Sequence, residues 1–314
     1  MLPFLLTPYL KKVLWGGSAL APFKGLPAHL DHIGESWEVS AMPGCESVVA
    51  SGPYEGMTLL ELCRLHGKEL MGKAVYESTG GEFPLLVKFI DAADDLSVQV
   101  HPGDELARRR HGCAGKCEMW YILHSHPGTR LGAGLREPLT PEDFERRVSD
   151  GTFGDAIEWY ETSPGDIFYL PAGRVHAIGA GNMLLEVQQP SDITYRIYDY
   201  NRRDDAGNLR PLHIDHARDA IDFSTADTYR VSADGDTLLR SEHFTVQRID
   251  VVADKPYDLH RECFTALMSI AGEATVATAD GSCSLTLQCG HSMIVPADTA
   301  VVISGTATII TAIP

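Results

Sequence analysis

The chain has 314 residues, which is long enough for two ordinary domains or for one large β unit with additions. Its 44% hydrophobic and 22% charged residues are typical of a well-packed globular protein. The formal net charge of −17 argues against a general nucleic-acid partner, because a phosphate backbone would be repelled, although local basic groups can still bind a small anion.

The cysteines do not predict a disulfide framework, because the seven of them are odd in number and irregularly scattered. Cys113 and Cys117 are wider apart than a CxxC pair and have no matching second pair, so free thiols are favoured over metal ligands or a redox couple. In the opening MLPFLLTPYLKK the lysines follow the apolar run, unlike those of a signal peptide, and no apolar stretch approaches transmembrane length. We therefore expect a cytoplasmic protein with no membrane partner.

The first part of the chain alternates between predicted strands and one helix. Residues 1–55 are rich in glycine and proline and predict strands and loops. Residues 57–75 space their apolar side chains at three and four, which predicts a helix. The stretch 84–102, PLLVKFIDAADDLSVQVHP, predicts two strands around a polar turn.

A second helical segment is predicted over residues 140–160. Thr140 suits an N-cap and Pro141 suits the first turn, and a further short helix follows before Ser163. From Pro164 onward, strand-like composition resumes.

The C-terminal part repeats an earlier pattern. GHSMIVPADTAVVIS, from Gly290, resembles GDIFYLPAGRVHAIG, from Gly165, and the shared order of strand pairs predicts a duplicated β-barrel. In the second copy Val301 stands at the position of His176, so we expect that barrel to lack a metal site. We predict a mainly β protein with two domains, which are residues 1–235, including the helical segments, and residues 236–314.

Three separate segments supply side chains that can bind a metal ion. In LSVQVHP, the alternation of strand side chains puts Gln99 and His101 on one face. In GKCEMWYIL, Glu118 shares a face with apolar residues, where an unpaired charge is costly. In the third segment, His176 opens a strand after a Pro-Ala-Gly turn.

Each of these residues also has an explanation without a metal. Gln99 and His101 suit a half-exposed strand, Glu118 suits an arginine partner or a strand edge, and His176 suits a structural role. Together they provide one carboxylate, two imidazoles and an amide, which is a donor set for a divalent ion such as zinc, manganese, iron or cobalt. We expect zinc, although glutamine is an uncommon zinc ligand.

Basic residues near these segments suit an anionic substrate. Arg196 follows the strand LLEVQQ, and its planar guanidinium suits phosphate or a developing oxyanion. An ion pair with Asp192 or Asp199 is the alternative. Lys116 lies two residues before the carboxylate and Lys88 lies in LLVKFID, where each can neutralise phosphate or lie in solvent.

Taken together, several motifs resemble the type I mannose-6-phosphate isomerases (phosphomannose isomerases), and specifically their short bacterial form. The motifs are GESWEVS (34–40), PLLVKFIDAADDLSVQVHPGDE (84–105), KCEMWYIL (116–123), GDIFYLPAGRVHAIG (165–179) and QQPSDITYRIYDYNR (188–202). They span roughly residues 5–220. In the C-terminal barrel the resemblance lies in the type of fold more than in particular sequence motifs.

The resemblance implies two cupin-like (jelly-roll) β-barrels with a small helical insertion. It implies one zinc ion bound by Gln99, His101, Glu118 and His176. It also implies that Arg196 and Lys116 are catalytic, and we expect Arg196, Lys116, Asp192 and Lys88 to bind the substrate or its phosphate. Long-form members carry a histidine before the Lys-x-Glu, where this chain has Gly115, so a mechanism that uses that histidine does not transfer.

The implied activity is the interconversion of mannose 6-phosphate and fructose 6-phosphate through a cis-enediolate. In this hypothesis Arg196 holds phosphate or the enediolate, Asp192 orients Arg196, and the base is Lys116 or a metal-bound water. The alternatives are a cupin iron oxygenase and a non-catalytic sugar-binding or regulatory cupin; the arginine and lysine favour the isomerase. The sequence leaves a monomer or a homodimer open.

Overall fold

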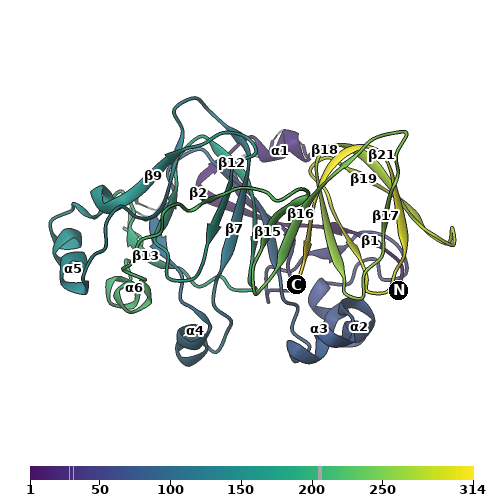
Figure 1. The fold of residues 1–314 in the computed structure, drawn as a ribbon, viewed down its shortest axis with the longest axis horizontal. Helices are drawn as coiled ribbons and strands as arrows, with labels where there is room; N and C mark the ends of the chain where they lie inside the picture. Colours follow the sequence, from purple (N-terminus) through teal and green to yellow (C-terminus); the bar gives the residue numbers. More distant parts are fainter. Residues whose placement is uncertain (28, 31, 204–206) are drawn as a thin grey trace.

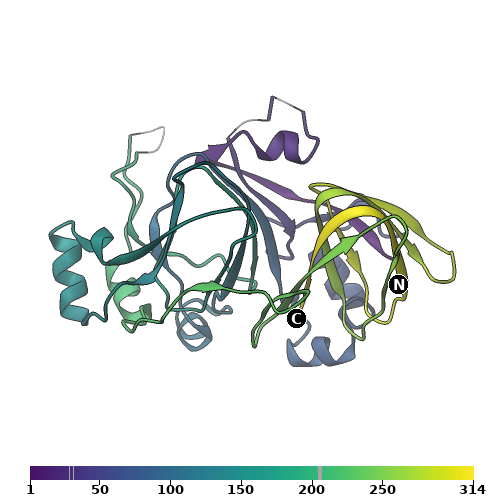
Figure 2. The same ribbon diagram turned by 45° about the horizontal axis from the view of Figure 1, so that its top comes forward.

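A computed structural model describes residues 1–27, 29–30, 32–203 and 207–314, and this part of the chain forms two β-barrels side by side (Figures 1 and 2). The strands lie in three sheets, and all their pairings are antiparallel. The predicted mainly β fold is therefore confirmed.

The first barrel consists of a seven-stranded and a five-stranded sheet. The seven-stranded sheet has the order β14 (Arg230–Val231), β10 (Ile167–Leu170), β7 (Glu118–Ser125), β12 (Asn182–Gln188), β5 (Leu86–Ala92), β2 (Tyr9–Gly17) and β3 (Ile33–Val39). The five-stranded sheet has the order β13 (Tyr195–Tyr198), β6 (Val98–Val100), β11 (His176–Ile178), β8 (Arg130–Leu135) and β9 (Ile157–Glu161).

The second barrel is one nine-stranded sheet that includes strands from the start of the chain. Its main path is β15 (Thr237–Arg240), β16 (Thr245–Val251), β21 (Val301–Ile313), β18 (Thr265–Thr278), β20 (Ser292–Val295), β1 (Phe4–Thr7) and β4 (Val48–Val49). Two further strands, β17 (Tyr257–Leu259) and β19 (Ser284–Gln288), pair with β21 and β18.

The helices lie outside the barrels (Figure 1). They are α1 (Leu20–Phe23), α2 (Leu59–Met71), α3 (Lys73–Ser78), α4 (Asp104–His111), α5 (Pro141–Ser149), α6 (Ile214–Ala220) and the 3-10 helix η1 (Phe153–Ala156). Among the described residues, none of these helices is long and apolar enough to cross a membrane.

Both predicted helical regions contain helices, with two differences. The 57–75 helix begins after Thr58, whose side chain forms a capping box with Glu61, and it is divided at Gly72, where φ is +86°. The second segment begins as predicted, with Thr140 as N-cap. The prediction for 157–160 was wrong, because these residues form strand β9 against β8.

The buried core continues across the two barrels. One cluster fills the first barrel between its two sheets and includes Trp120 and Phe168. Another joins the outer face of the seven-stranded sheet to the second barrel and to α2, and it includes Phe89 and Ile294. Apolar burial of this extent is the main source of stability in such a fold.

The repeated sequence pattern corresponds to repeated strands. β10 pairs with β7 through Leu170 and Glu118, and β20 pairs with β18 through Val295 and Thr265. The strand that follows begins at His176 in the first barrel and at Val301 in the second. The second barrel therefore carries threonine and valine where the first carries a carboxylate and an imidazole.

Candidate metal centre and substrate pocket

The sheets of the first barrel bring the predicted ligands together from both sides. Glu118 is the first residue of β7 in one sheet, and His176 is the first residue of β11 in the other. Gln99 lies on β6 directly opposite His176, and His101 follows two residues later. Both histidines and the glutamate are fully buried.

The donor atoms of three of these residues converge. His176 Nε2 lies 3.3 Å from Glu118 Oε1, and His101 Nε2 lies 3.5 Å from Glu118 Oε2. Ligand atoms of the three residues all lie within 4.8 Å of one another. This spacing is of the size needed for one ion to contact all three side chains.

Backbone carbonyls fix the orientation of both imidazole rings. His101 Nδ1 lies 2.8 Å from the carbonyl oxygen of Ile193, and His176 Nδ1 lies 2.9 Å from that of Arg174. If each Nδ1 donates its proton there, each Nε2 presents a lone pair to the centre. The indole of Trp120 packs edge-on against the His176 ring, with 5.3 Å between ring centroids.

Burial keeps the two imidazoles neutral. It lowers the pKa of His176 to about 3 and that of His101 well below its usual value, with the Lys116 ammonium adding to both effects. Burial raises the pKa of Glu118 to about 7, against the opposing charge of Lys116. Glu118 Oε1 and His176 Nε2 are buried without a hydrogen-bond partner, which is costly unless a cation binds between them. The residues therefore fit a divalent metal ion.

Lys116 lies beside the same atoms. Its Nζ is 2.6 Å from Glu118 Oε2 and 3.0 Å from His101 Nε2. The residue before it has no room for a side chain, because a Cβ on Gly115 would come within 2.6 Å of the backbone nitrogen of Asp104. Close backbone packing thus accounts for glycine at this position.

The centre adjoins a cavity of about 310 Å³. Five of the predicted site residues line this cavity, namely Gln99, Lys116, Lys88, Asp192 and Arg196. Two acidic residues that were not predicted from the sequence, Glu35 and Glu186, line it as well. The size is in the range of small-molecule sites.

The two acidic residues enclose a buried lysine. Lys88 Nζ lies 3.1 Å from Glu186 and 3.7 Å from Glu35. Burial alone would lower the pKa of Lys88, but the two carboxylates outweigh it and hold that pKa above its usual value. Burial opposes ionisation of Glu186 as well, yet Lys116 and Lys88 lower its pKa to about 2. The sequence signal that could have identified Glu186 is its position as a charged residue within the apolar strand pattern LLEVQQ.

Arg196 lies at this cavity without the predicted partner. Its Nη1 donates to the carbonyl oxygen of Pro211 at 3.0 Å, and its Nε is buried without a partner. Among the described residues, Asp192 instead lies 3.9 Å from Lys11. An orienting contact from Asp192 to Arg196 is therefore not observed.

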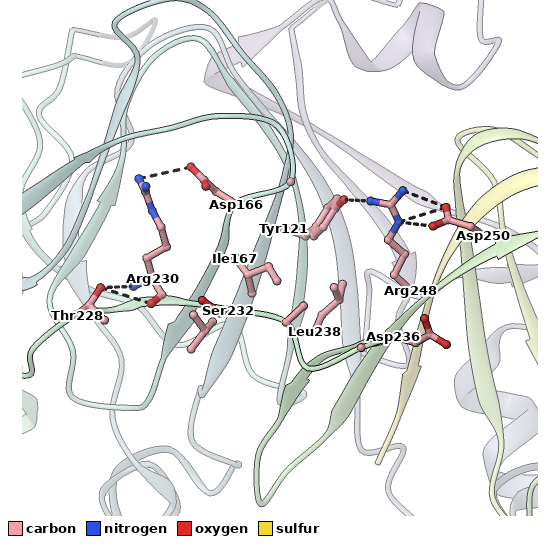
Figure 3. A pocket seen from close by; sticks show the side chains of 14 residues that line it. Tyr121, Asp166, Ile167, Thr228, Arg230, Ser232, Asp236, Leu238, Arg248 and Asp250 are labelled. Carbon is pink, nitrogen blue, oxygen red and sulfur yellow. Dashed lines mark hydrogen bonds and ion pairs between the residues drawn. The ribbon is translucent and has the colours of Figure 1, made fainter.

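A second groove, of about 660 Å³, lies between the barrels and holds none of the predicted residues (Figure 3). Four of its charged side chains pair with one another: Arg230 lies 3.4 Å from Asp166, and Arg248 lies 3.0 Å from Asp250. The convergence of donor atoms makes the first cavity the candidate site.

Several known proteins are similar to this chain in sequence and in fold. The family model for the type I phosphomannose isomerase catalytic domain matches residues 4–129. Mannose-6-phosphate isomerase ManA of Bacillus subtilis is 41% identical over 221 residues, which are 70% of this chain and 68% of the relative. Putative mannose-6-phosphate isomerase YvyI of the same organism is 34% identical over 98% of each chain. The crystal structure of mannose 6-phosphate isomerase from Bacillus subtilis superposes with a TM-score of 0.89 at 32% identity and covers 99% of each chain. The chain therefore belongs to the type I phosphomannose isomerase family.

Proposed function

We propose that the chain interconverts mannose 6-phosphate and fructose 6-phosphate with one divalent ion, which we expect to be Zn²⁺. The observation that carries the proposal is the convergence of His101, Glu118 and His176 beside Lys116 at one end of a cavity that also contains Arg196. Membership in the family favours this activity over a cupin oxygenase or a non-catalytic cupin.

Gln99, His101, Glu118 and His176 would hold the ion. The neutral imidazoles and the unpartnered Glu118 Oε1 are suited to it, and the mixed nitrogen and oxygen donors fit zinc. When bound, the ion supplies Lewis-acid polarisation of the sugar's carbonyl and hydroxyl oxygens.

The reaction moves a proton between C1 and C2 of the open-chain sugar through a cis-enediolate. Lys116 is the candidate to carry that proton, because its Nζ lies beside the ligand atoms and lines the cavity. Lys88, held between Glu186 and Glu35, adds a fixed positive charge near the sugar. Arg196 would bind the phosphate through its unpartnered Nε.

A coupled assay tests the activity. Mannose 6-phosphate conversion to fructose 6-phosphate is measured before and after treatment with a chelator, and again after zinc is restored. We expect activity to be lost with the chelator and regained with zinc. Full activity in chelated, metal-free protein would contradict the metal dependence.

The ligand assignment is tested with Glu118→Ala. Without this carboxylate we expect the purified protein to retain little metal by elemental analysis, and kcat to fall by at least about a thousandfold, an effect of the size seen when a catalytic centre is disrupted. Glu105→Ala on α4 is the control, because Glu105 is 95% exposed, and it leaves both readouts unchanged. Normal metal content in the Glu118 variant would refute the assignment.

We also keep the cytoplasm as the expected compartment. All seven cysteines are free thiols, including the buried Cys63 and Cys117, which suits a reducing environment.

A further inference from the structure

A cluster of arginines lies at the cavity, on two adjacent segments of chain. β13 carries Arg196, and the segment that leads to α6 carries Arg210; both line the cavity. The segments are joined by backbone contacts, since the amide of His213 donates to the carbonyl oxygen of Arg196 at 2.7 Å and the Arg196 amide donates to His213 Nδ1 at 3.1 Å. The two arginines therefore lie on neighbouring segments that line the same cavity.

One buried carboxylate anchors the second arginine. Asp199 accepts from Arg210 Nε at 2.6 Å and also from Arg210 Nη2. Arg202 binds the same carboxylate, with Nη2 at 2.5 Å from Oδ1. Burial would raise the pKa of Asp199, but these arginines outweigh it and hold the pKa below its usual value. The fork geometry leaves Arg210 Nη1 without a hydrogen bond among the described residues, and Arg210 lines the cavity.

The loop that carries this anchor has an unusual backbone. Tyr200 and Asn201 both have positive φ, +53° and +54°, and the Arg202 amide donates to the Asp199 carbonyl oxygen at 3.0 Å. Two consecutive left-handed residues that are not glycine cost energy. The turn places the Asp199 carboxylate between Arg202 and Arg210.

The cluster has an excess of positive charge. Arg202 and Arg210 bind the buried carboxylate of Asp199, and Arg196 lies close enough to be affected by its charge. The three arginines outnumber this carboxylate and that of the exposed Asp94, which lies 3.5 Å from Arg202. Burial lowers the pKa of Arg196 and the nearby Arg210 lowers it further, which shows that the two cations repel. An anion that contacts both would relieve this repulsion.

We propose that Arg210 is a second ligand for the substrate's phosphate, paired with Arg196, and that Asp199 is the residue that positions it. This inference rests on the proposed function. A phosphate dianion would accept from Arg196 Nε and Arg210 Nη1, while the uncharged sugar reaches inward to Gln99 and Lys116 along the same cavity.

The test compares the metal-loaded protein with Arg210→Gln. Two measurements are made: the affinity for inorganic phosphate by calorimetry, and KM and kcat for mannose 6-phosphate. We expect phosphate affinity to weaken and KM to rise by about ten- to a hundredfold, the effect of one charge-assisted contact, while kcat changes by less than about threefold. Arg218→Gln is the matched control; Arg218 lies on α6, pairs with Glu145 and does not line the cavity, so neither readout changes.

Arg210→Lys separates binding from a structural role. Lysine keeps the charge but loses the two-bond fork to Asp199, so we expect its phosphate affinity to lie between those of the unaltered chain and Arg210→Gln. If Arg210→Gln does not fold, Arg210→Lys alone tests whether Arg210 binds phosphate.

Unchanged phosphate affinity and KM in the variants, or a loss confined to kcat, would overturn the inference, as would a lack of phosphate binding by the unaltered chain. If the unaltered chain binds phosphate but does not turn over mannose 6-phosphate, the proposed function fails while the phosphate measurements still decide the role of Arg210.

Discussion

His101, His176 and Glu118 couple the stability of the metal-free chain to pH. Buried histidines that stay neutral destabilise the fold in acid, because the unfolded chain binds the protons that the folded chain excludes. Glu118 acts in the opposite direction, because its folded pKa, about 7, lies above its usual 4.5. Its contribution is fully present below pH 4.5 and is lost as pH rises through 7.

We expect chelated protein to lose stability as pH falls from 6.5 to 4.5. In that window unfolding binds two protons at His101 and His176 and releases one from Glu118, a net uptake of one. This uptake lowers the free energy of unfolding by about 1.4 kcal/mol per pH unit. Below 4.5 Glu118 is protonated in both states, so the uptake rises toward two until His176 titrates near pH 3.

Urea denaturation of chelated protein at several pH values measures this slope. His176→Gln removes one of the two proton-binding groups, so its slope in acid is shallower by about 1.4 kcal/mol per pH unit. The exposed His260→Gln is the control and leaves the slope unchanged. Equal slopes for His176→Gln and the unaltered chain would show that burial does not hold this imidazole neutral.

At the residue scale, the sequence predicted what strand alternation and motif order can specify. Alternation put Gln99 and His101 on one face, and the structure places Gln99 opposite His176 and the His101 ring beside the His176 ring. It did not identify Glu186 or Arg210, because their roles depend on pairings between distant strands and loops. The proposed contact between Asp192 and Arg196 failed for the same reason: nearness in sequence did not determine which charges meet.

At the scale of elements, a buried ion pair joins the α1 segment to both barrels. Lys24, just after α1, donates to Glu38 on β3 at 2.7 Å and also to the carbonyl oxygen of Gly290, next to β20. Ser292 on β20 donates to the other Glu38 oxygen at 3.0 Å. The pair is 3% and 0% exposed, so its charges depend on each other.

We expect Lys24→Met to destabilise the protein strongly. It leaves the Glu38 carboxylate buried without its cation, which costs about 3–5 kcal/mol in the free energy of unfolding. The double variant Lys24→Met/Glu38→Leu removes both charges and should recover most of this loss. Lys73→Met at the exposed start of α3 is the control, with an effect within about 0.5 kcal/mol. A loss below about 1 kcal/mol for Lys24→Met in urea denaturation would contradict the expectation.

Helices were predicted from the sequence where apolar side chains recur at helical spacing or where a clear N-cap residue is present. The Thr140 cap marked the start of α5, whereas α1, α4 and α6 were not predicted. These helices are at most eight residues long, and α4 buries only Ala107, so the apolar spacing that identifies a helix is nearly absent. The strand β9 was taken for a helix because it follows one closely, and its strand form depends on pairing with β8.

At the scale of the whole molecule, the second barrel includes strands from the start of the chain. β14 closes the edge of the first barrel and β15 begins the second, so the path crosses between them near the predicted boundary at residues 235 and 236. β1 nevertheless pairs with β20, placing Leu6 opposite Ser292. Both termini lie at the second barrel (Figure 1). We propose that residues 236–314 form a domain only together with this N-terminal strand.

The fragment 236–314 tests that proposal. All four residues of β20 are buried, and without β1 one of its edges and the contacts of Phe4 and Leu6 are lost. Unpaired backbone at a buried strand is costly, so we expect the fragment alone to show no cooperative urea transition. Adding a peptide of residues 1–8 in excess should restore a transition whose midpoint rises with peptide concentration, because binding to the folded state stabilises it by mass action. The same peptide with Leu6→Asp, which cannot fill the core position, is the control and restores nothing. A sharp transition of the fragment without peptide would show that the second barrel is an independent domain and that β1 only adds to it.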